Sequence, residues 1–330
     1  MSWVDRLTAA IDRSPVRPWV LYLLLFGLLL VALLGLAGAQ APVSFPIYFL
    51  TAVWAVFPLA LIHHLDRVSA AAFDQFRPVC DLNEAEARGL RLDLTTMPAA
   101  PVAIVSLAGA GFIWFFYFTN RSLFGPMLGS SAQFVVGMAV MTFSFAMLAV
   151  LLYHTLRQLR MVSRIYARLQ RLDLFNLSPL YGFAALAART SIAWAVALYL
   201  SLALNPGILE SDIAIGAFLV QASLVLGSFA WPLVGIHRRI VQEKEGALAR
   251  VGESLNRAIA ELNRRTASMS LAGMDALNKM VLSLVASRDV LAKVPTWPWS
   301  PGTPVAVGSA LLLPVGLFII ERLLSTFFGL

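Results

Sequence analysis

Four long stretches of the chain contain almost no charged residues, and they restrict its fold more than any other feature. They cover residues 19–62, 94–156, 190–237 and 294–330. The charged exceptions are Arg121 in the second stretch, Glu210 and Asp212 in the third, and Glu321 and Arg322 in the fourth. A helix needs about 20 apolar residues to cross a bilayer, and a helix satisfies its own backbone there. The sequence therefore predicts an all-α, polytopic membrane protein.

Turn-forming residues divide each of the first three stretches into two spans. The breaks contain Pro, Gly, Asn and Ser, and they lie at residues 39–46, 119–131 and 205–212. We therefore expect seven transmembrane helices, at residues 19–38, 46–63, 99–118, 133–154, 183–204, 213–236 and 303–327. The first should be retained, because its apolar core exceeds the roughly 7–15 residues of a signal peptide. The composition agrees, since 13% of the residues are charged, against about 25% in soluble proteins.

The basic residues predict the orientation in the membrane. Of the 25 Lys and Arg residues, all but Arg121 and Arg322 fall in segments that seven spans place on one side. These segments are residues 1–18, 64–98, 155–190 and 238–301. Because the basic side is normally cytoplasmic, we expect a cytoplasmic N-terminus and an outside C-terminus, in a prokaryotic plasma (inner) membrane. Such a basic side attracts anionic lipid headgroups, so the charge balance requires no nucleic-acid partner. The lone Cys80 permits no disulfide framework.

A short pattern recurs where three of the spans reach the cytoplasmic side. Residues 57–68 read FPLALIHHLDRV, residues 231–242 read WPLVGIHRRIVQ, and the fourth span ends similarly with His154. Each copy leads into a predicted cytoplasmic helix and then into a turn before the next span. Internal symmetry of this kind is common in membrane transport folds, so we predict a threefold internal repeat. Any helix that leaves a membrane with Pro, His and Arg would look alike, which is the alternative.

The chain is predicted to contain four regions. Residues 1–18 form an N-terminal amphipathic helix, and residues 19–237 form a six-helix transmembrane region with cytoplasmic helices at 65–90 and 155–172. A cytoplasmic helical hairpin at 238–301, with coiled-coil character, precedes a C-terminal transmembrane helix at 302–330. The first hairpin helix carries an apolar stripe with helical spacing, which we predict to mediate oligomerisation: Leu248, Val251, Leu255, Ile259 and Leu262. After the hairpin, Trp297 and Trp299 are placed to anchor the chain at the membrane interface.

The four histidines lie at the cytoplasmic ends of predicted spans: His63, His64, His154 and His237. Imidazoles there can satisfy the terminal carbonyl groups of helices, which is the reading we favour. They can also sense pH or bind Zn²⁺, with Asp66 nearby, although no HxxxH or HExxH spacing occurs. We therefore assign them as interfacial residues and expect no bound metal.

The C-terminal span is the strongest candidate for a conduit. It combines small residues and a proline with two adjacent charges, and its candidate pore-lining residues are Ser309, Pro314, Gly316, Ile320, Glu321 and Arg322. Ionisable residues within a membrane are functional candidates by default. The alternative is that Glu321 and Arg322 are an ordinary interfacial pair at the outer end of the span.

Three functions are compatible with these features. We expect no enzyme and no cofactor, because no nucleophile elbow, phosphate-binding loop, dinucleotide fingerprint or CxxC pair occurs. The first hypothesis is a homo-oligomeric ion channel or channel-like pore lined by the C-terminal helix, which conducts ions or responds to a small ligand. The second is a non-conducting sensor or scaffold that signals through the hairpin. The third is a metal-dependent membrane hydrolase that uses the histidines.

In topology alone, the predicted arrangement resembles the insect chemoreceptor channels. The shared features are seven spans, a cytoplasmic N-terminus and cytoplasmic helices packed before the last span. That resemblance implies subunits assembled around a pore lined by the final helix. No motif residue of that family can be matched in this sequence, so no residue role is transferred.

Overall fold

The described part of the chain is helical throughout, which confirms the all-α prediction. The computed structural model describes residues 1–38, 41–124, 130–169, 172–204, 212–269, 273–310 and 312. Helices account for 88% of the structure, and the residues just given include no β-strand. Six helical segments in these ranges are long and apolar enough to cross a bilayer, so the chain is an integral membrane protein.

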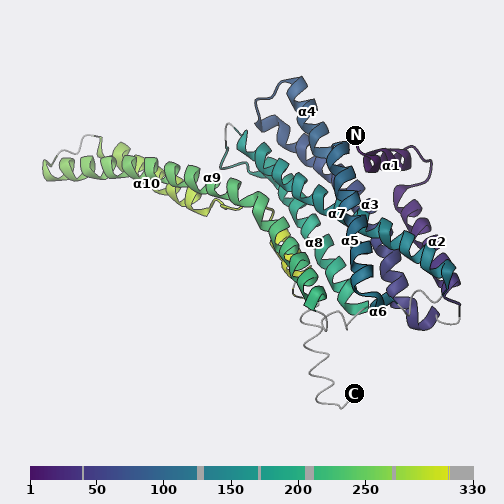
Figure 1. Cartoon of the computed structure of the whole chain (residues 1–330). Coiled ribbons are helices and arrows are strands. Elements are labelled where there is room, and N and C mark those ends of the chain that lie inside the picture. The colour runs from purple at the N-terminus through teal and green to yellow at the C-terminus, as the bar shows by residue number, and fades with distance from the viewer. Residues whose placement is uncertain are drawn as a thin grey trace, which may run out of the picture.

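Each of the first six predicted spans coincides with part of one helix, to within one residue at its ends (Figure 1). These helices are α2 (Pro18–Ala37), α3 (Ala41–Phe76), α5 (Ala99–Thr119), α7 (Ser131–Ala167), α8 (Tyr181–Leu204) and α9 (Asp212–Ala267). Of the predicted seventh span, residues 303–310 and 312 are helical, and the rest lies outside the described residues. The count of seven spans, the orientation and the threefold repeat therefore remain predictions.

Three of the six helices are much longer than a bilayer requires. Helices α3, α7 and α9 contain 36, 37 and 56 residues. At about 1.5 Å per residue they extend roughly 54, 55 and 84 Å, against a hydrocarbon core of about 30 Å. Their extensions lie at the end of the bundle that also carries α1 (Trp3–Asp12) and α4 (Glu84–Thr95) (Figure 1). We call this the basic end, and α6 (Arg121–Phe124) lies at the opposite end.

The predicted cytoplasmic helix 65–90 corresponds to two segments rather than one. Helix α3 continues to Phe76, a short 3₁₀ turn follows over Arg77–Val79, and α4 then starts after Asn83. Pro78 favours the break, and Asn83 forms a capping box with Glu86 that starts a new helix. The predicted cytoplasmic helix 155–172 begins as a direct continuation of α7, which ends at Ala167.

The core of the bundle is formed mainly by α3, α7 and α8. At its basic end three aromatic rings, Phe76, Tyr166 and Phe183, meet edge to face with centroids 5.4–5.6 Å apart. The buried Tyr166 hydroxyl donates to the Leu180 carbonyl oxygen at 2.8 Å, so its polar atom is satisfied. Near the middle of α5, Gly109 allows close approach to α7, because a Cβ atom there would lie 2.4 Å from the Phe145 carbonyl oxygen.

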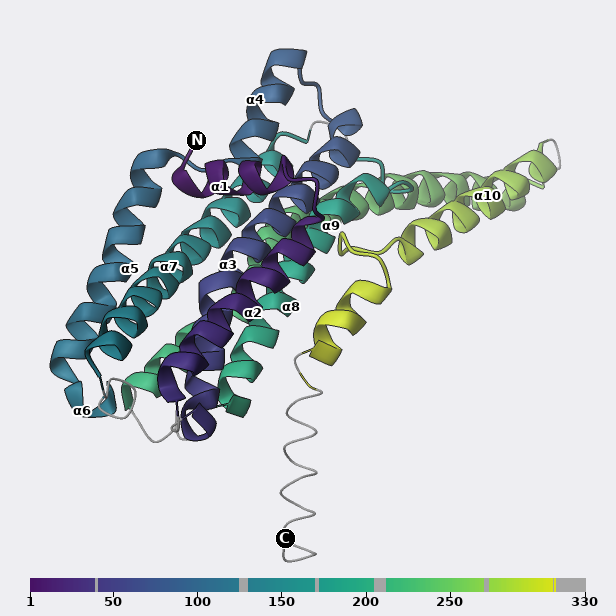
Figure 2. The same ribbon diagram turned by 90° about the vertical axis from the view of Figure 1, so that its right-hand side faces the viewer.

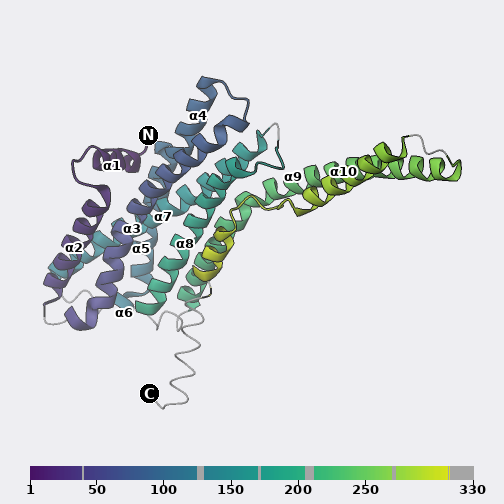
Figure 3. The ribbon, with the colours of Figure 1, turned by 180° about the vertical axis from the view of Figure 1, so that it is seen from behind.

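Helix α9 leaves the bundle and forms a long arm with α10 (Met274–Lys293). We define the arm as residues 238–293; it projects away from the other helices in Figures 1 and 3. Helix α9 contains Pro232, which removes one backbone hydrogen bond and favours a bend where the helix emerges. Helix α9 ends at Ala267, and Gly273 precedes α10 as its N-terminal cap with φ +71°.

Helix α1 packs across the basic end (Figure 2). Its Val4 and Ile11 side chains are buried in the main hydrophobic core, whereas Trp3 and Leu7 on another face remain more than a third exposed. Ser2 caps the helix and forms a capping box with Asp5. The helix is therefore held by protein on one side and presents apolar side chains on the other, as an interfacial helix does.

Candidate functional site

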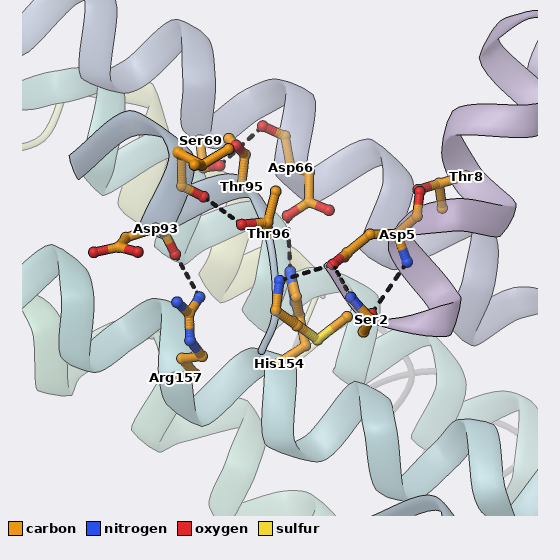
Figure 4. Close-up of polar contacts among 12 residues, drawn as sticks. Ser2, Asp5, Thr8, Asp66, Ser69, Asp93, Thr95, Thr96, His154 and Arg157 are labelled. Carbon is orange, nitrogen blue, oxygen red and sulfur yellow. Dashed lines mark hydrogen bonds and ion pairs between the residues drawn. The ribbon is translucent and has the colours of Figure 1, made fainter. Parts of the chain in front are cut away.

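Buried charged side chains gather at the basic end, where α1, α3 and α7 meet. Figure 4 shows Asp5, Asp66 and His154, one from each of these helices, lying close together. All three lie at or beyond the predicted membrane boundaries at residues 63 and 154. Buried charges must be paired or hydrogen-bonded, because an unpaired charge in a protein interior is costly. We call these three residues the junction cluster.

Asp5 connects α1 to the start of α5. Its Oδ2 atom accepts hydrogen bonds from the backbone N–H of Ser2 at 2.7 Å and of Met97 at 3.1 Å. The Ser2 hydroxyl in turn accepts from the Asp5 N–H at 3.2 Å. Because Asp5 is 5% exposed and Ser2 is fully buried, these bonds are shielded from water. A capping residue thus also fixes the N-terminal helix to the bundle.

His154 and Asp66 form a buried, hydrogen-bonded pair between α7 and α3. The His154 Nε2 atom shares a hydrogen bond with Asp66 Oδ1 at 2.9 Å, and the two side chains are 3% and 15% exposed. The negative charge of Asp5 also acts on Asp66, which places a second carboxylate beside the pair. Arg157, one turn further along α7, donates to the Asp93 carbonyl oxygen at the end of α4. The cluster therefore links four helices at one level.

A second histidine holds the ends of α1, α2 and α3 together. The His63 Nδ1 atom shares a hydrogen bond with the Tyr22 hydroxyl at 2.8 Å, and its Nε2 atom shares one with Asp12 Oδ2 at 3.0 Å. Arg67, one turn along α3, forms an ion pair with the other Asp12 oxygen. His63 is 4% exposed, so both of its ring nitrogens form hydrogen bonds with protein groups rather than with water. This imidazole connects three helices, where the sequence predicted an interfacial cap.

The other two histidines have different surroundings. His64 is exposed, and the charges of Arg189 and Arg67 act on it. His237 on α9 shares a hydrogen bond with the Thr296 carbonyl oxygen at 2.9 Å and stacks on Trp297 at 3.9 Å. Within the described ranges, no three His, Cys, Asp or Glu side chains are grouped as a metal ion would require.

Two buried polar atoms on α7 have no hydrogen-bond partner in the described part of the chain: His154 Nδ1 and Gln158 Nε2. The two side chains are 3% and 2% exposed and lie one helical turn apart, so they share a face. Between them, Thr155 accepts a hydrogen bond from the Trp194 indole at 3.3 Å. The interior of the basic end is therefore polar over about one turn of α7, residues 154–158, which apolar patterning did not reveal.

Trp297 and Trp299 lie against protein side chains. Four rings stack in series, from His237 through Trp297 and Trp299 to Phe229, with centroid distances of 3.9, 4.5 and 5.3 Å. Beside this stack, Lys244 donates to the carbonyl oxygens of Ala292 and Val294 at 2.7 and 2.8 Å. The segment that returns from the arm is thus fixed to α9, and both indoles remain half-buried next to the core.

Of the predicted pore-lining residues, the structure places only Ser309. Ser309 is exposed on the helix at 302–310, whereas Val307 on the same helix is 4% exposed. Pro314, Gly316, Ile320, Glu321 and Arg322 lie outside the described residues. The C-terminal helix thus starts at the edge of the bundle with one face against protein.

The predicted oligomerisation stripe lies along the arm. Leu248, Val251, Leu255 and Leu262 are half-buried in the hairpin, whereas Ile259 is 39% exposed. Near the end of α9, Glu261 forms ion pairs with Arg265 and Arg264, and hydrogen bonds from these guanidinium groups lower the pKa of its carboxyl. Closer to the bundle, the arm borders a groove of about 640 Å³, whose lining includes Phe175, Arg250 and Val290.

The residues that sequence reasoning missed are mostly single polar side chains whose partners are distant in sequence. Asp5, Asp12 and Tyr22 precede the histidine region by 41 residues or more, and Gln158 lies within an otherwise unremarkable amphipathic segment. Comparisons with protein-family models, with curated proteins and with solved structures each gave no match to this chain.

Proposed function

We propose that this protein is a homo-oligomeric membrane channel or channel-like pore, in which the arm joins neighbouring subunits and the C-terminal segment lines the conduit. The observation that carries this proposal is the arm. From Arg238 to Ala267, α9 extends about 45 Å, and the only helix packed along it among the described elements is α10. A two-helix hairpin that projects from the bundle leaves the outer faces of both helices free to contact another subunit.

The outer face of the arm favours protein contact. Leu282, Val285 and Val290 lie on one side of α10 and are 60%, 40% and 55% exposed, although the sequence places this region in water. Apolar side chains gathered on an exposed face are typical of interaction surfaces. The half-buried stripe on α9 faces the inside of the hairpin. The outer face of α10 therefore remains available to contact a partner.

A second copy of the chain is the partner that the charges favour. The arm carries ten basic and six acidic residues, whereas the tip formed by the end of α3 and α4, residues 74–93, carries five acidic and three basic residues. Opposite charges steer association between surfaces. An arm that docks on the tip of the next subunit makes a head-to-tail contact, and such contacts form a ring when the rotation between neighbouring subunits closes.

The C-terminal helix supports a conduit by its position. Val305 and Leu312 are 68% and 70% exposed, while Val307 faces protein. A helix held on one face leaves its opposite face for a neighbouring subunit or for a water-filled path. Together with the order of the elements, this agrees with the topological resemblance to chemoreceptor channels, in which the last helix lines the pore.

Cross-linking tests the assembly. Cys80, the only cysteine of the chain, lies in the tip. Arg257→Cys adds a thiol to the arm, and a bifunctional maleimide should then give dimers and larger products on a denaturing gel. The same variant with Cys80→Ser should lose these tip-to-arm products. A wild-type protein that is monomeric by native mass spectrometry would overturn the proposal.

Planar-bilayer recording of the purified protein tests conduction. We expect discrete currents whose amplitude or selectivity changes in Glu321→Gln, because that carboxylate is predicted near the outer mouth. Glu253→Gln, an equal charge change on the exposed arm, is the matched control and should conduct as wild type. An oligomeric, folded protein without any current would reject the channel.

That last outcome favours the second candidate, a non-conducting sensor or scaffold. The exposed apolar residues of α10 support it, because they also suit a different protein. If the arm binds a different protein instead of a second copy, the Arg257→Cys variant should give no tip-to-arm product. The hydrolase hypothesis gains nothing from the described residues, since His63, His154 and His237 each bind different protein groups.

A further inference from the structure

One positively charged surface of the bundle belongs neither to the junction cluster nor to the arm. It is formed by His64 and Arg67 on α3 and by Arg189 on α8. The packing of these two helices gives their register. A Cβ atom at Gly182 would lie 2.9 Å from the Ala72 Cα atom, so positions 72 and 182 are level.

The two helices run in opposite directions from that contact, as Figure 3 shows. Because both rise about 1.5 Å per residue, seven residues back along α3 and seven residues forward along α8 bring Leu65 level with Arg189. The neighbouring His64 therefore lies beside Arg189. The electrostatic action of Arg189 and Arg67 on His64 agrees with this placement.

All three side chains are open to the surroundings. His64 and Arg189 are exposed, and the Arg67 side chain is 56% exposed. Arg67 forms an ion pair with Asp12, which also bonds His63. Within the part of the chain that the structure describes, Arg189 has no hydrogen-bond or ion-pair partner. The surface therefore carries two guanidinium groups and an imidazole against one carboxylate.

The depth of this surface matches that of lipid phosphates. Arg189 lies eight residues after the start of α8, a helix that crosses the bilayer, and it is level with the predicted end of the second span at residue 63. An unpaired charge on a lipid-facing helix is costly unless it reaches the interface or an anion. The planar guanidinium group binds phosphate oxygens through two parallel hydrogen bonds.

The surface also has room for an acyl chain. Val196 lies seven residues after Arg189, on the same face of α8, and is 54% exposed. On α3, Phe57 lies seven residues before His64, on the same face of the helix, and is half-buried. A lipid whose phosphate meets the cations can therefore lay its chain along apolar side chains above them. Basic sites between transmembrane helices bind anionic headgroups in this way.

We propose that His64, Arg67 and Arg189 form a binding site for the phosphate of an anionic phospholipid headgroup. The net positive charge selects an anionic headgroup over a zwitterionic one. The site does not depend on conduction or on the arm, so it stands apart from the proposed function.

Native mass spectrometry of the full chain in mild detergent tests the site. Wild type titrated with phosphatidylglycerol should retain a bound lipid more strongly than with phosphatidylcholine. Arg189→Gln should weaken phosphatidylglycerol binding about tenfold, and Arg189→Lys should retain part of it, because a point charge lacks the planar fork. His64→Gln, at a second exposed position, should weaken binding independently. Arg88→Gln, an equal charge change on exposed α4, should bind as wild type.

The outcomes separate the possible sources of the phosphate group. The proposal would be overturned if the Arg189→Gln and Arg88→Gln variants retained phosphatidylglycerol equally. It would also be overturned if wild type retained phosphatidylglycerol and phosphatidylcholine equally. Displacement of the lipid by millimolar inorganic phosphate would assign the site to free phosphate and reject the lipid. Unchanged melting temperatures of the variants would show that the affinity changes arise at the site.

Discussion

Replacing Asp66 by Asn should destabilise the protein more than any other single charge change at the basic end. His154 is 3% exposed and shares a hydrogen bond of 2.9 Å with Asp66, whose side chain is 15% exposed. Removing one partner of a buried ion pair costs about 3–5 kcal/mol, because the other is left without compensation. Since Asn still accepts a hydrogen bond, we expect the lower value, about 3 kcal/mol.

Thermal unfolding in detergent, followed by tryptophan fluorescence, measures this effect. A loss of 1 kcal/mol shifts the melting temperature by roughly 2–4 °C in domains of moderate size, so Asp66→Asn should lower it by roughly 6–12 °C. The matched control is Asp74→Asn. Asp74 pairs with Arg91 at 3.2 Å, but the two side chains are 57% and 49% exposed. A pair open to water contributes about 0–1 kcal/mol, so the control should shift the melting temperature by roughly 4 °C or less.

A double-mutant cycle isolates the interaction itself. His154→Gln alone and combined with Asp66→Asn should give a coupling energy of about 1.5–3 kcal/mol, because the two groups share one buried hydrogen bond. The reasoning fails if Asp66→Asn melts at the same temperature as Asp74→Asn. It also fails if the effects of the two junction substitutions simply add.

Two further substitutions test the helix contacts that support the site. Gly109→Ala should lower the free energy of unfolding by about 1–3 kcal/mol, because its Cβ atom would lie 2.4 Å from the Phe145 carbonyl oxygen and would push α5 from α7. The control is Gly111→Ala, which has no atom within 4 Å of its Cβ position and should be neutral or slightly stabilising. Equal effects of the two substitutions would disprove the close approach of the helices. Lys244→Met should increase hydrogen exchange several-fold at the C-terminal end of α10, where it removes two bonds to carbonyl oxygens. Lys279→Met, which removes only an exposed ion pair, should leave that end unchanged, and identical exchange in both variants would contradict the role of Lys244.

The spans were predictable because their signal is local. A run of about 20 apolar residues reports on the surroundings of one helix and needs no knowledge of its neighbours. The continuity of α9 from the bundle into the arm was not predictable, because a charged segment after an apolar one does not indicate whether the backbone bends or breaks.

The junction cluster was only partly predictable. His63 and His154 stood out because histidine is rare here, and Asp66 stood out because it lies near His64. Asp5 and Asp12 gave no such signal, because their role depends on α1 docking against helices that follow much later in the chain. Trp297 and Trp299 illustrate another limit. An indole near a membrane interface predicts burial of the ring, but the same pattern fits lipid or, as here, protein.

The arm and the start of the C-terminal helix are mechanically one unit. Helix α9 runs without a break through Pro232 into the arm, and the stacked rings and Lys244 fix the returning segment to the same helix. A force on the end of the arm therefore acts through a lever of about 45 Å on the point where α9 leaves the bundle. The helix at 302–310 begins directly after the stack, so a rotation of the arm must displace it too. If neighbouring subunits hold each other by their arms, assembly positions every C-terminal helix relative to the next one.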